Sequence, residues 1–182
     1  MPRGRHVVQT ALVRLRRDLG CPELSPAHRL DRLTAGVLLF TVRREVRGAY
    51  QTMFARGEVA KTYLARSSAS PGLVGPQVVS NRIGKRRGVL QACVEPGEPN
   101  AETLVEPLGG GLYRLTPRTG RTHQLRLHMA GLGLAIDNDP LYPRILEVDP
   151  ADFSAPLQLL AQRLEFTDPI TGQHRSFVSS RA

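Results

Sequence analysis

The sequence predicts an α+β protein in which a mixed or antiparallel sheet is flanked by helices. Two observations lead to this class. Many short β-branched or alternating segments are spread along the 182 residues, and three segments are expected to be helical, two of them with the apolar period of an amphipathic helix. Because no internal repeat and no domain boundary is visible, we expect residues 1–182 to form one domain with an ordinary apolar core.

Three segments are expected to be helical, namely residues 7–19, 44–55 and 122–130. The first repeats apolar residues on one face and is followed by the stop signals Gly20 and Pro22. The second has apolar residues at the i, i+3, i+4, i+7 and i+8 positions. The third is opened by Thr119-Gly120 and ended by Gly131 and Gly133.

Short strands are expected between and after these helices, at residues 36–43, 58–66, 77–80, 89–94, 101–107, 111–115, 157–166 and 174–179. The first is apolar and β-branched, which is typical of a buried strand. The segment 101–115 reads as a hairpin that turns at Gly109-Gly110, and the last two strands are joined by a turn at 168–172. Residues 82–87 are expected to form a basic loop, for which we predict RNA contacts.

The charge of the chain points to a polyanionic partner. Its 25 basic and 16 acidic residues give a net charge of +9, and Lys61 and Lys85 are the only lysines. Arginine binds phosphate with two parallel hydrogen bonds and stacks on bases, so the composition favours nucleic acid. The alternative is a set of solvated arginines that reflects an arginine-rich codon usage.

Other features of the composition exclude several classes of protein. Two cysteines, Cys21 and Cys93, are too few for a disulfide framework or a zinc site. The longest uncharged apolar run, residues 33–42, is about half of a membrane span, and no secretory apolar segment follows Met1. We therefore expect a cytoplasmic protein with no membrane partner and no bound metal.

Three segments concentrate polar groups suited to chemistry. In HRLDRLTAG (28–36), Asp31 lies between two arginines, which favours its charged form and suits a nucleophile or an electrostatic stabiliser. KTYL (61–64) offers an aromatic platform, and TGRTHQLR (119–126) offers a helix start suited to phosphate. Read singly, these segments fit equally a loop salt bridge, a core tyrosine and a capped helix.

Taken together and in this order, the three segments resemble the RluA-type family of RNA pseudouridine synthases. The likeness extends to AET at 101–103, DPLY at 139–142 and the strand pair near the end of the chain, and it covers about residues 7–175. It implies an isomerase that converts uridine in rRNA or tRNA to pseudouridine without a cofactor. We expect a monomer, with RNA as its partner.

The resemblance also implies roles for single residues. It identifies Asp31 as the catalytic aspartate, Tyr63 as the residue that stacks on the uracil and takes part in proton removal at C5, and Arg126 as the basic partner of the aspartate. Whether the aspartate attacks the sugar or assists loss of the base as a glycal stays open. Substrate-binding roles are expected for His28, Arg29, Arg32, Thr34, Lys61, Arg121, Thr122, His123 and Gln124.

Some positions depart from the family pattern. Ala35 replaces a usual Ser, Asn138 a usual Gly and Leu160 a common His, and none of these removes a proposed catalytic group. Because Asn tolerates a left-handed backbone, its presence at 138 is expected to be neutral. The family's usual upstream strand, which ends in Lys-Pro, and an S4-type domain are expected to be missing here. Two interpretations stay open: the sequence starts at an internal Met, or the protein manages without the strand. If the strand is absent, we expect an uncovered sheet edge and a less secure scaffold.

Other functions fit less well. A non-catalytic RNA-binding remnant of the same family is the main alternative. Residues 28–31 superficially resemble a kinase catalytic loop, but no glycine-rich phosphate loop accompanies them. A glycosidase needs two facing carboxylates, and only Asp31 lies in a plausible cluster. Asp137 and Asp139 suggest a metal site only weakly, because Pro140 marks a turn there.

Overall fold

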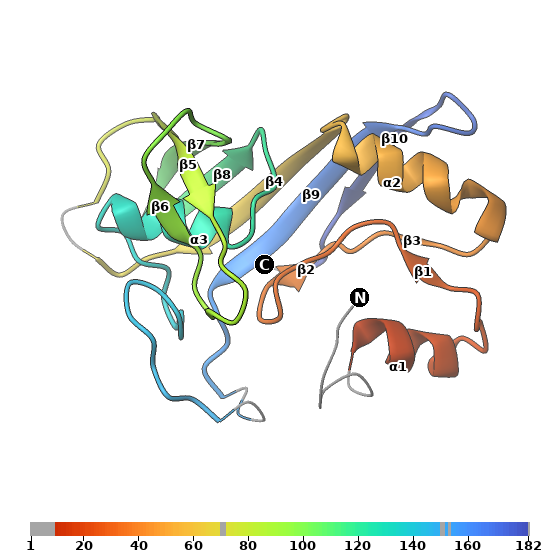
Figure 1. Ribbon diagram of the computed structural model, residues 1–182, viewed down its shortest axis with the longest axis horizontal. Helices are drawn as coiled ribbons and strands as arrows, with labels where there is room; N and C mark the ends of the chain where they lie inside the picture. Colours follow the sequence, from red (N-terminus) through yellow and green to blue (C-terminus); the bar gives the residue numbers. More distant parts are fainter. Residues whose placement is uncertain (1–9, 70–71, 150–151, 153, 182) are drawn as a thin grey trace. The chain divides into compact units, whose positions relative to one another are not determined.

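The computed structural model describes residues 10–69, 72–149, 152 and 154–181 and divides the chain into two compact units (Figure 1). The first unit comprises Leu38–Val59, Phe166–Arg175 and the described part of Met1–Arg29. The second comprises Leu30–Val37, Ala60–Glu165 and the described part of Ser176–Ala182. Each unit is described by itself. The expectation of one domain over the whole chain stays a prediction.

The first unit contains most of the helical residues. Its elements are α1 (Ala11–Asp18), β1 (Ser25–Pro26), β3 (Phe40–Thr41), the 3-10 turn η2 (Arg44–Val46) and α2 (Arg47–Ala55). The Thr10 hydroxyl accepts a hydrogen bond from the Val13 N–H at 3.3 Å and caps the start of α1. The strands β1 and β3 pair antiparallel. The helix expected at 44–55 is confirmed, as is the described part of 7–19, whose residues 7–9 lie outside the described chain.

The main sheet belongs mostly to the second unit. Its strands are β2 (Ala35–Gly36), β4 (Val59–Arg66), β5 (Gln77–Gly84), β6 (Cys93–Glu95), β7 (Ala101–Gly109), β8 (Leu112–Pro117), β9 (Leu159–Thr167) and β10 (His174–Val178). The order is β10-β9-β4-β8-β7-β5-β6, and β2 pairs parallel with β9. The pairs β4–β8, β8–β7, β7–β5 and β5–β6 are antiparallel. The expected α+β class with a mixed sheet is thus confirmed.

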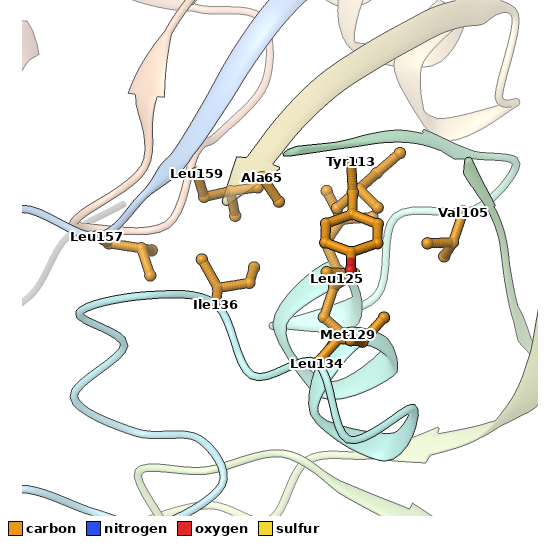
Figure 2. Close-up of a cluster of buried hydrophobic side chains, with 10 residues drawn as sticks. Ala65, Val105, Tyr113, Leu125, Met129, Leu134, Ile136, Leu157 and Leu159 are labelled. Atoms are coloured by element: carbon orange, nitrogen blue, oxygen red, sulfur yellow. The ribbon is translucent and has the colours of Figure 1, made fainter. Parts of the chain in front are cut away.

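An apolar core joins one face of this sheet to α3 (Gln124–Gly131) and to the segment that follows it (Figure 2). Leu125 and Met129 of α3 pack against side chains of the strands and of the following segment. The other buried members of this cluster are Ala65, Val105, Tyr113, Leu115, Leu134, Ile136, Leu157 and Leu159. Because the core holds β4 and α3 together, residues on these two elements keep fixed relative positions.

The strand expected at residues 36–43 is wrong. The structure divides it into β2 and β3, which pair with different strands, and only Thr41 of this stretch is buried. Gly36 explains the break. Its φ is +111°, and an added Cβ would lie 2.2 Å from the Ala161 carbonyl oxygen. The backbone therefore approaches β9 so closely that regular pairing ends after two residues.

Smaller differences concern three boundaries. The expected loop at 82–87 begins as strand, because β5 continues through Gly84. The strand expected at 89–94 is shortened to β6, and α3 begins at Gln124, two residues later than expected. The 101–115 hairpin and the final strand pair are confirmed. Asn138 has a φ of 61°, which agrees with the tolerance expected for asparagine.

Gly36→Ala should lower the free energy of unfolding by about 2 kcal/mol or more, since the new Cβ meets backbone atoms as well as an unfavourable φ. Gly88→Ala is the matched control, because Gly88 also has a positive φ but open space around it. The Gly88→Ala variant should lose only about 1 kcal/mol of unfolding free energy. Urea unfolding of both variants measures the difference, and equal losses would contradict the close approach.

Candidate active site

The loop that carries Asp31 is fixed by the short strand after it. The Thr34 N–H donates to the Asp31 carbonyl oxygen at 3.0 Å, which closes a tight turn. The chain then enters β2, and the Val37 N–H donates to the Ala161 carbonyl oxygen at 2.9 Å. No hydrogen bond or ion pair to the Asp31 side chain is found among the described residues. The carboxylate is therefore held in place by backbone contacts and remains available for chemistry.

Strand β4 carries Lys61 and Tyr63 on one face. Ala65, two residues further along the same face, is buried in the core, and Tyr63 packs against that core. Burial, together with the negative charge of Asp31, raises the pKa of Tyr63 to about 12, so its phenol is neutral at neutral pH. Burial lowers the pKa of Lys61. The Lys61 ammonium lies 3.6 Å from the position of a Cβ on Gly120, beside the loop before α3.

The loop before α3 is tied down by Gln124. The side-chain amide oxygen of Gln124 (Oε1) accepts from the Thr119 hydroxyl at 2.7 Å and from the Arg121 backbone N–H at 3.0 Å. Its amide nitrogen donates to the Glu102 carbonyl oxygen and to the Thr103 hydroxyl, both at 2.9 Å. Both polar atoms of this buried side chain are thus hydrogen-bonded within the protein. One N–H expected to bind phosphate at this helix start is already occupied.

Arg126 and Asp139 form a buried ion pair. The Arg126 Nε donates at 2.8 Å and Nη2 at 2.5 Å to the two carboxylate oxygens, and the residues are only 3% and 5% exposed. Asp139 also accepts from the N–H groups of Leu141 and Tyr142. Asp139 thus binds Arg126 through both carboxylate oxygens in a buried site. The expected pairing of Arg126 with Asp31 stays a prediction.

Tyr142 connects this ion pair to His123. The Arg126 guanidinium lies 5.4 Å from the centre of the Tyr142 ring, and the His123 Nδ1 lies 3.0 Å from the Tyr142 hydroxyl. His123 precedes α3 with a left-handed φ of 56°. Burial lowers the pKa of His123, an effect that Asp31 opposes and Arg126 reinforces. Burial raises the pKa of Tyr142, and the Asp31 charge contributes to that rise.

Four residues predicted from three separate segments therefore come together. The charge of Asp31 acts on Tyr63 and on His123, and the charge of Arg126 acts on the same histidine. Such interactions weaken with distance and are screened over about 10 Å at 0.1 M salt. The arrangement is a carboxylate beside an aromatic ring, a neutral imidazole and an anchored guanidinium, which suits acid–base or nucleophilic work on a polar substrate.

The remaining expected contact residues lie on the surface or in the first unit. Thr34 and Thr122 are half-buried, and Arg32 and Arg121 are exposed. The Arg121 Nε donates to the Asn100 carbonyl oxygen at 3.0 Å.

In the first unit, His28 stacks on Phe54 with ring centres 4.4 Å apart, and its Nε2 accepts from the Leu39 N–H at 3.1 Å. Arg29, the next residue, is exposed. The ring of His28 thus supports the fold of the first unit.

The sequence profile of a family described as RNA pseudouridylate synthase matches residues 5–131, more than half of the chain. The chain belongs to the RNA pseudouridylate synthase family. This confirms the RluA-type resemblance.

Relatives within the pseudouridylate synthase family cover most of the chain. The dual-specificity RNA pseudouridine synthase RluA of Salmonella typhi is 33% identical over 177 residues, which are 91% of this chain and 76% of that protein. An uncharacterized RNA pseudouridine synthase of Haemophilus influenzae is 32% identical over 135 residues, 72% of this chain and 60% of that protein. The chain thus spans between about three fifths and three quarters of the length of these two relatives.

Solved structures agree with this assignment. The human RNA Pseudouridylate Synthase Domain Containing 1 has a TM-score of 0.73 and 25% identity with this chain. The match covers 96% of this chain and 75% of the human one. The α+β architecture is therefore that of a pseudouridylate synthase domain.

Sequence reasoning missed the roles of Asp139 and Tyr142. Both lie in the DPLY segment, which matched the family pattern, but nothing in the sequence tied that segment to Arg126 or His123.

Within the described ranges, no group of three or more metal-ligating side chains is found. No helix among those residues is long and apolar enough to cross a membrane.

His128 of α3 is a buried histidine that bonds to two strands of the sheet. Its Nδ1 lies 2.9 Å from the Thr103 hydroxyl and its Nε2 lies 3.0 Å from the Asn81 amide oxygen. Burial lowers the pKa of His128 to about 4. The amide oxygen can only accept, so the neutral ring donates from Nε2 and accepts at Nδ1. The bonds link β5, β7 and α3.

Because the pKa of His128 is lowered on folding, the unfolded chain binds its proton first as the pH falls. Stability from this residue is complete above about pH 6.5 and is lost progressively down to about pH 4. At pH 5 the chain should lose about 2 kcal/mol of unfolding free energy relative to pH 7 from His128 alone. Urea unfolding at both pH values tests this, with His128→Gln as control. The same pH dependence in the variant would contradict the assignment.

Proposed function

We propose that this chain converts specific uridines in structured rRNA or tRNA to pseudouridine, with Asp31 as the catalytic group. The observation that carries the proposal is the gathering of Asp31, Tyr63 and Arg126 in one site of a pseudouridylate synthase domain. We further propose that the protein acts as a cytoplasmic monomer and uses no cofactor.

The reaction breaks the bond between N1 of uracil and C1′ of ribose and joins C5 to C1′. The C5 hydrogen leaves as a proton and N1 gains one, so nothing is oxidised and no group leaves the RNA. One carboxylate is sufficient, either as nucleophile at C1′ or as an aid to loss of the base as a glycal. The Asp31 side chain suits both routes, because it has no hydrogen bond or ion pair within the described parts of the chain.

Tyr63 and Arg126 complete the proposed catalytic set. The half-buried ring of Tyr63 offers a surface for the uracil after it has left the RNA stack. A neutral phenol accepts protons poorly, so the raised pKa of Tyr63 supports stacking more strongly than direct removal of the C5 proton. Asp139 uses Nε and Nη2 of Arg126, which leaves Nη1 as the positive group for the Asp31 region.

RNA contacts are proposed for the substrate-binding residues expected from the sequence: His28, Arg29, Arg32, Thr34, Lys61, Arg121, Thr122, His123 and Gln124. Of these, Gln124 acts through the loop it ties down. In the 82–87 segment, the Lys85 ammonium donates to the carbonyl oxygens of Val89, Leu90 and Gln91. The exposed arginines of the segment, Arg82, Arg86 and Arg87, are the candidates for phosphate contacts.

Tritium release from [5-³H]uridine-labelled total cellular RNA tests the activity. Wild-type protein should release tritium, and Asp31→Asn should reduce release by at least about 10³-fold, as the loss of a catalytic nucleophile does. The variant should bind the same RNA with unchanged affinity. No release by either folded protein would contradict the proposal and favour the RNA-binding remnant.

Arg86→Glu should weaken RNA binding and lower the slope of log K against log salt by about 1 or more, since at least one phosphate contact is lost. Filter binding across a salt series measures the slope. Arg163→Glu, on the exposed side of β9, makes the same charge change and is the control. Equal slopes for both variants would rule out a specific contact at Arg86.

A further inference from the structure

His123 stands out because its backbone is left-handed and one of its ring nitrogens is already in use. A φ of 56° is uncommon for a residue with a Cβ, although histidine adopts it more often than most residues. His123 directly precedes α3, and the charges of Asp31 and Arg126 act on its ring. The contact of Nδ1 with the Tyr142 hydroxyl orients the imidazole.

The hydroxyl of Tyr142 determines which nitrogen of His123 carries the proton. Three groups surround this hydroxyl: the Ala92 N–H at 2.7 Å, the Ala92 carbonyl oxygen at 3.1 Å and the His123 Nδ1 at 3.0 Å. The hydroxyl has one proton to give and can accept two. The Ala92 N–H must donate to it, and the Ala92 carbonyl oxygen must accept from it.

With the single proton of Tyr142 given to Ala92, the contact with His123 requires a proton on Nδ1. The opposite assignment gives the hydroxyl proton to Nδ1 and leaves two oxygens 3.1 Å apart with no proton between them. That arrangement costs a buried, unsatisfied carbonyl group. The network therefore fixes the tautomer with the proton on Nδ1, and the neutral ring carries its lone pair on Nε2.

That lone pair faces away from Tyr142. Nδ1 and Nε2 lie on different sides of the imidazole ring, and no hydrogen-bond partner of Nε2 is found in the described part of the chain. Because Asp31 and Arg126 both act on this ring, the acceptor belongs to the pocket in which the reaction is proposed. Such a fixed acceptor calls for a donor on the substrate.

We propose that His123 Nε2 accepts a hydrogen bond from the N3–H of the flipped uracil and so selects uracil over cytosine. This inference rests on the proposed function. Uracil joined to ribose carries one ring N–H, at N3. Cytosine presents a lone pair at that position, so the same pose would set two acceptors against each other and leave both unpaired. Tyr142 is then a positioning residue, which acts through the tautomer of His123.

Two substitutions separate this role from a structural one. His123→Gln places its amide oxygen near the position of Nε2, whereas His123→Asn keeps a donor near Nδ1 for Tyr142 and removes the Nε2 acceptor. Asparagine also suits the left-handed backbone better than glutamine. A structural role therefore predicts that the Asn variant is the better enzyme, and the proposed role predicts the Gln variant.

Tritium release from uridine-labelled RNA should give a kcat/KM for His123→Asn about fivefold or more below that of His123→Gln, as expected for one lost hydrogen bond. In the ¹⁵N NMR spectrum of the imidazole, wild-type protein should show the proton on Nδ1. An Asn variant as active as or more active than the Gln variant, or a proton on Nε2, would overturn the proposal. If wild-type protein releases no tritium, the proposed function fails instead.

The donor is identified on a synthetic RNA after the target uridine has been mapped. Replacing that uridine by 3-methyluridine should weaken binding to the wild type by about fivefold or more and should have little further effect on His123→Asn. Replacing it by 2′-deoxyuridine should affect both proteins equally. The reverse pattern would assign the hydrogen bond to the ribose hydroxyl and contradict selection of the base.

Discussion

The buried ion pair between Arg126 and Asp139 is the interaction on which the rest of the site depends. Removing both charges from water costs several kcal/mol for each ion, and only near-ideal geometry offsets this. Here the guanidinium donates two parallel hydrogen bonds, and two backbone N–H groups saturate the same carboxylate. The pair therefore fixes α3 against the segment around residues 139–142.

Several features of the site follow from that anchoring. With the backbone at 141–142 fixed, the Tyr142 ring lies by the guanidinium and its hydroxyl reaches Ala92 and His123. The core in Figure 2 holds β4 to the same helix, which brings Tyr63 into range. Asp31 is positioned differently, by the close contact between the backbone of Gly36 and that of Ala161 in β9. The position of the proposed site thus depends on the Arg126–Asp139 ion pair, on this core and on Gly36.

The sequence predicted much of this because local patterns carry local information. The amphipathic helix at 44–55, the 101–115 hairpin and the alternating strand at 58–66 each follow from periodicity and turn residues. The motifs around Asp31, Tyr63 and Arg126 identified the family, which the profile match confirms.

What the sequence could not supply was the long-range choice of partners. Nothing local in the sequence links Arg126 to Asp139, and only the folded segment at 139–142 shows that Asp139 binds it with both carboxylate oxygens in a buried site. The apolar run at 36–43 looked like one buried strand, because nothing local reveals that β2 and β3 pair with different partners. The proton on His123 Nδ1 depends on Ala92, a residue with no polar side chain.

A double-mutant cycle on Arg126 and Asp139 tests the central role of the ion pair most directly. Urea unfolding is measured for the wild type, Arg126→Met, Asp139→Asn and the double variant. Each single change should cost about 3–5 kcal/mol, because it leaves an uncompensated buried group. The double variant should be more stable than the sum of the two losses predicts, with a coupling of about 2 kcal/mol or more. Simple additivity of the two losses would contradict the account.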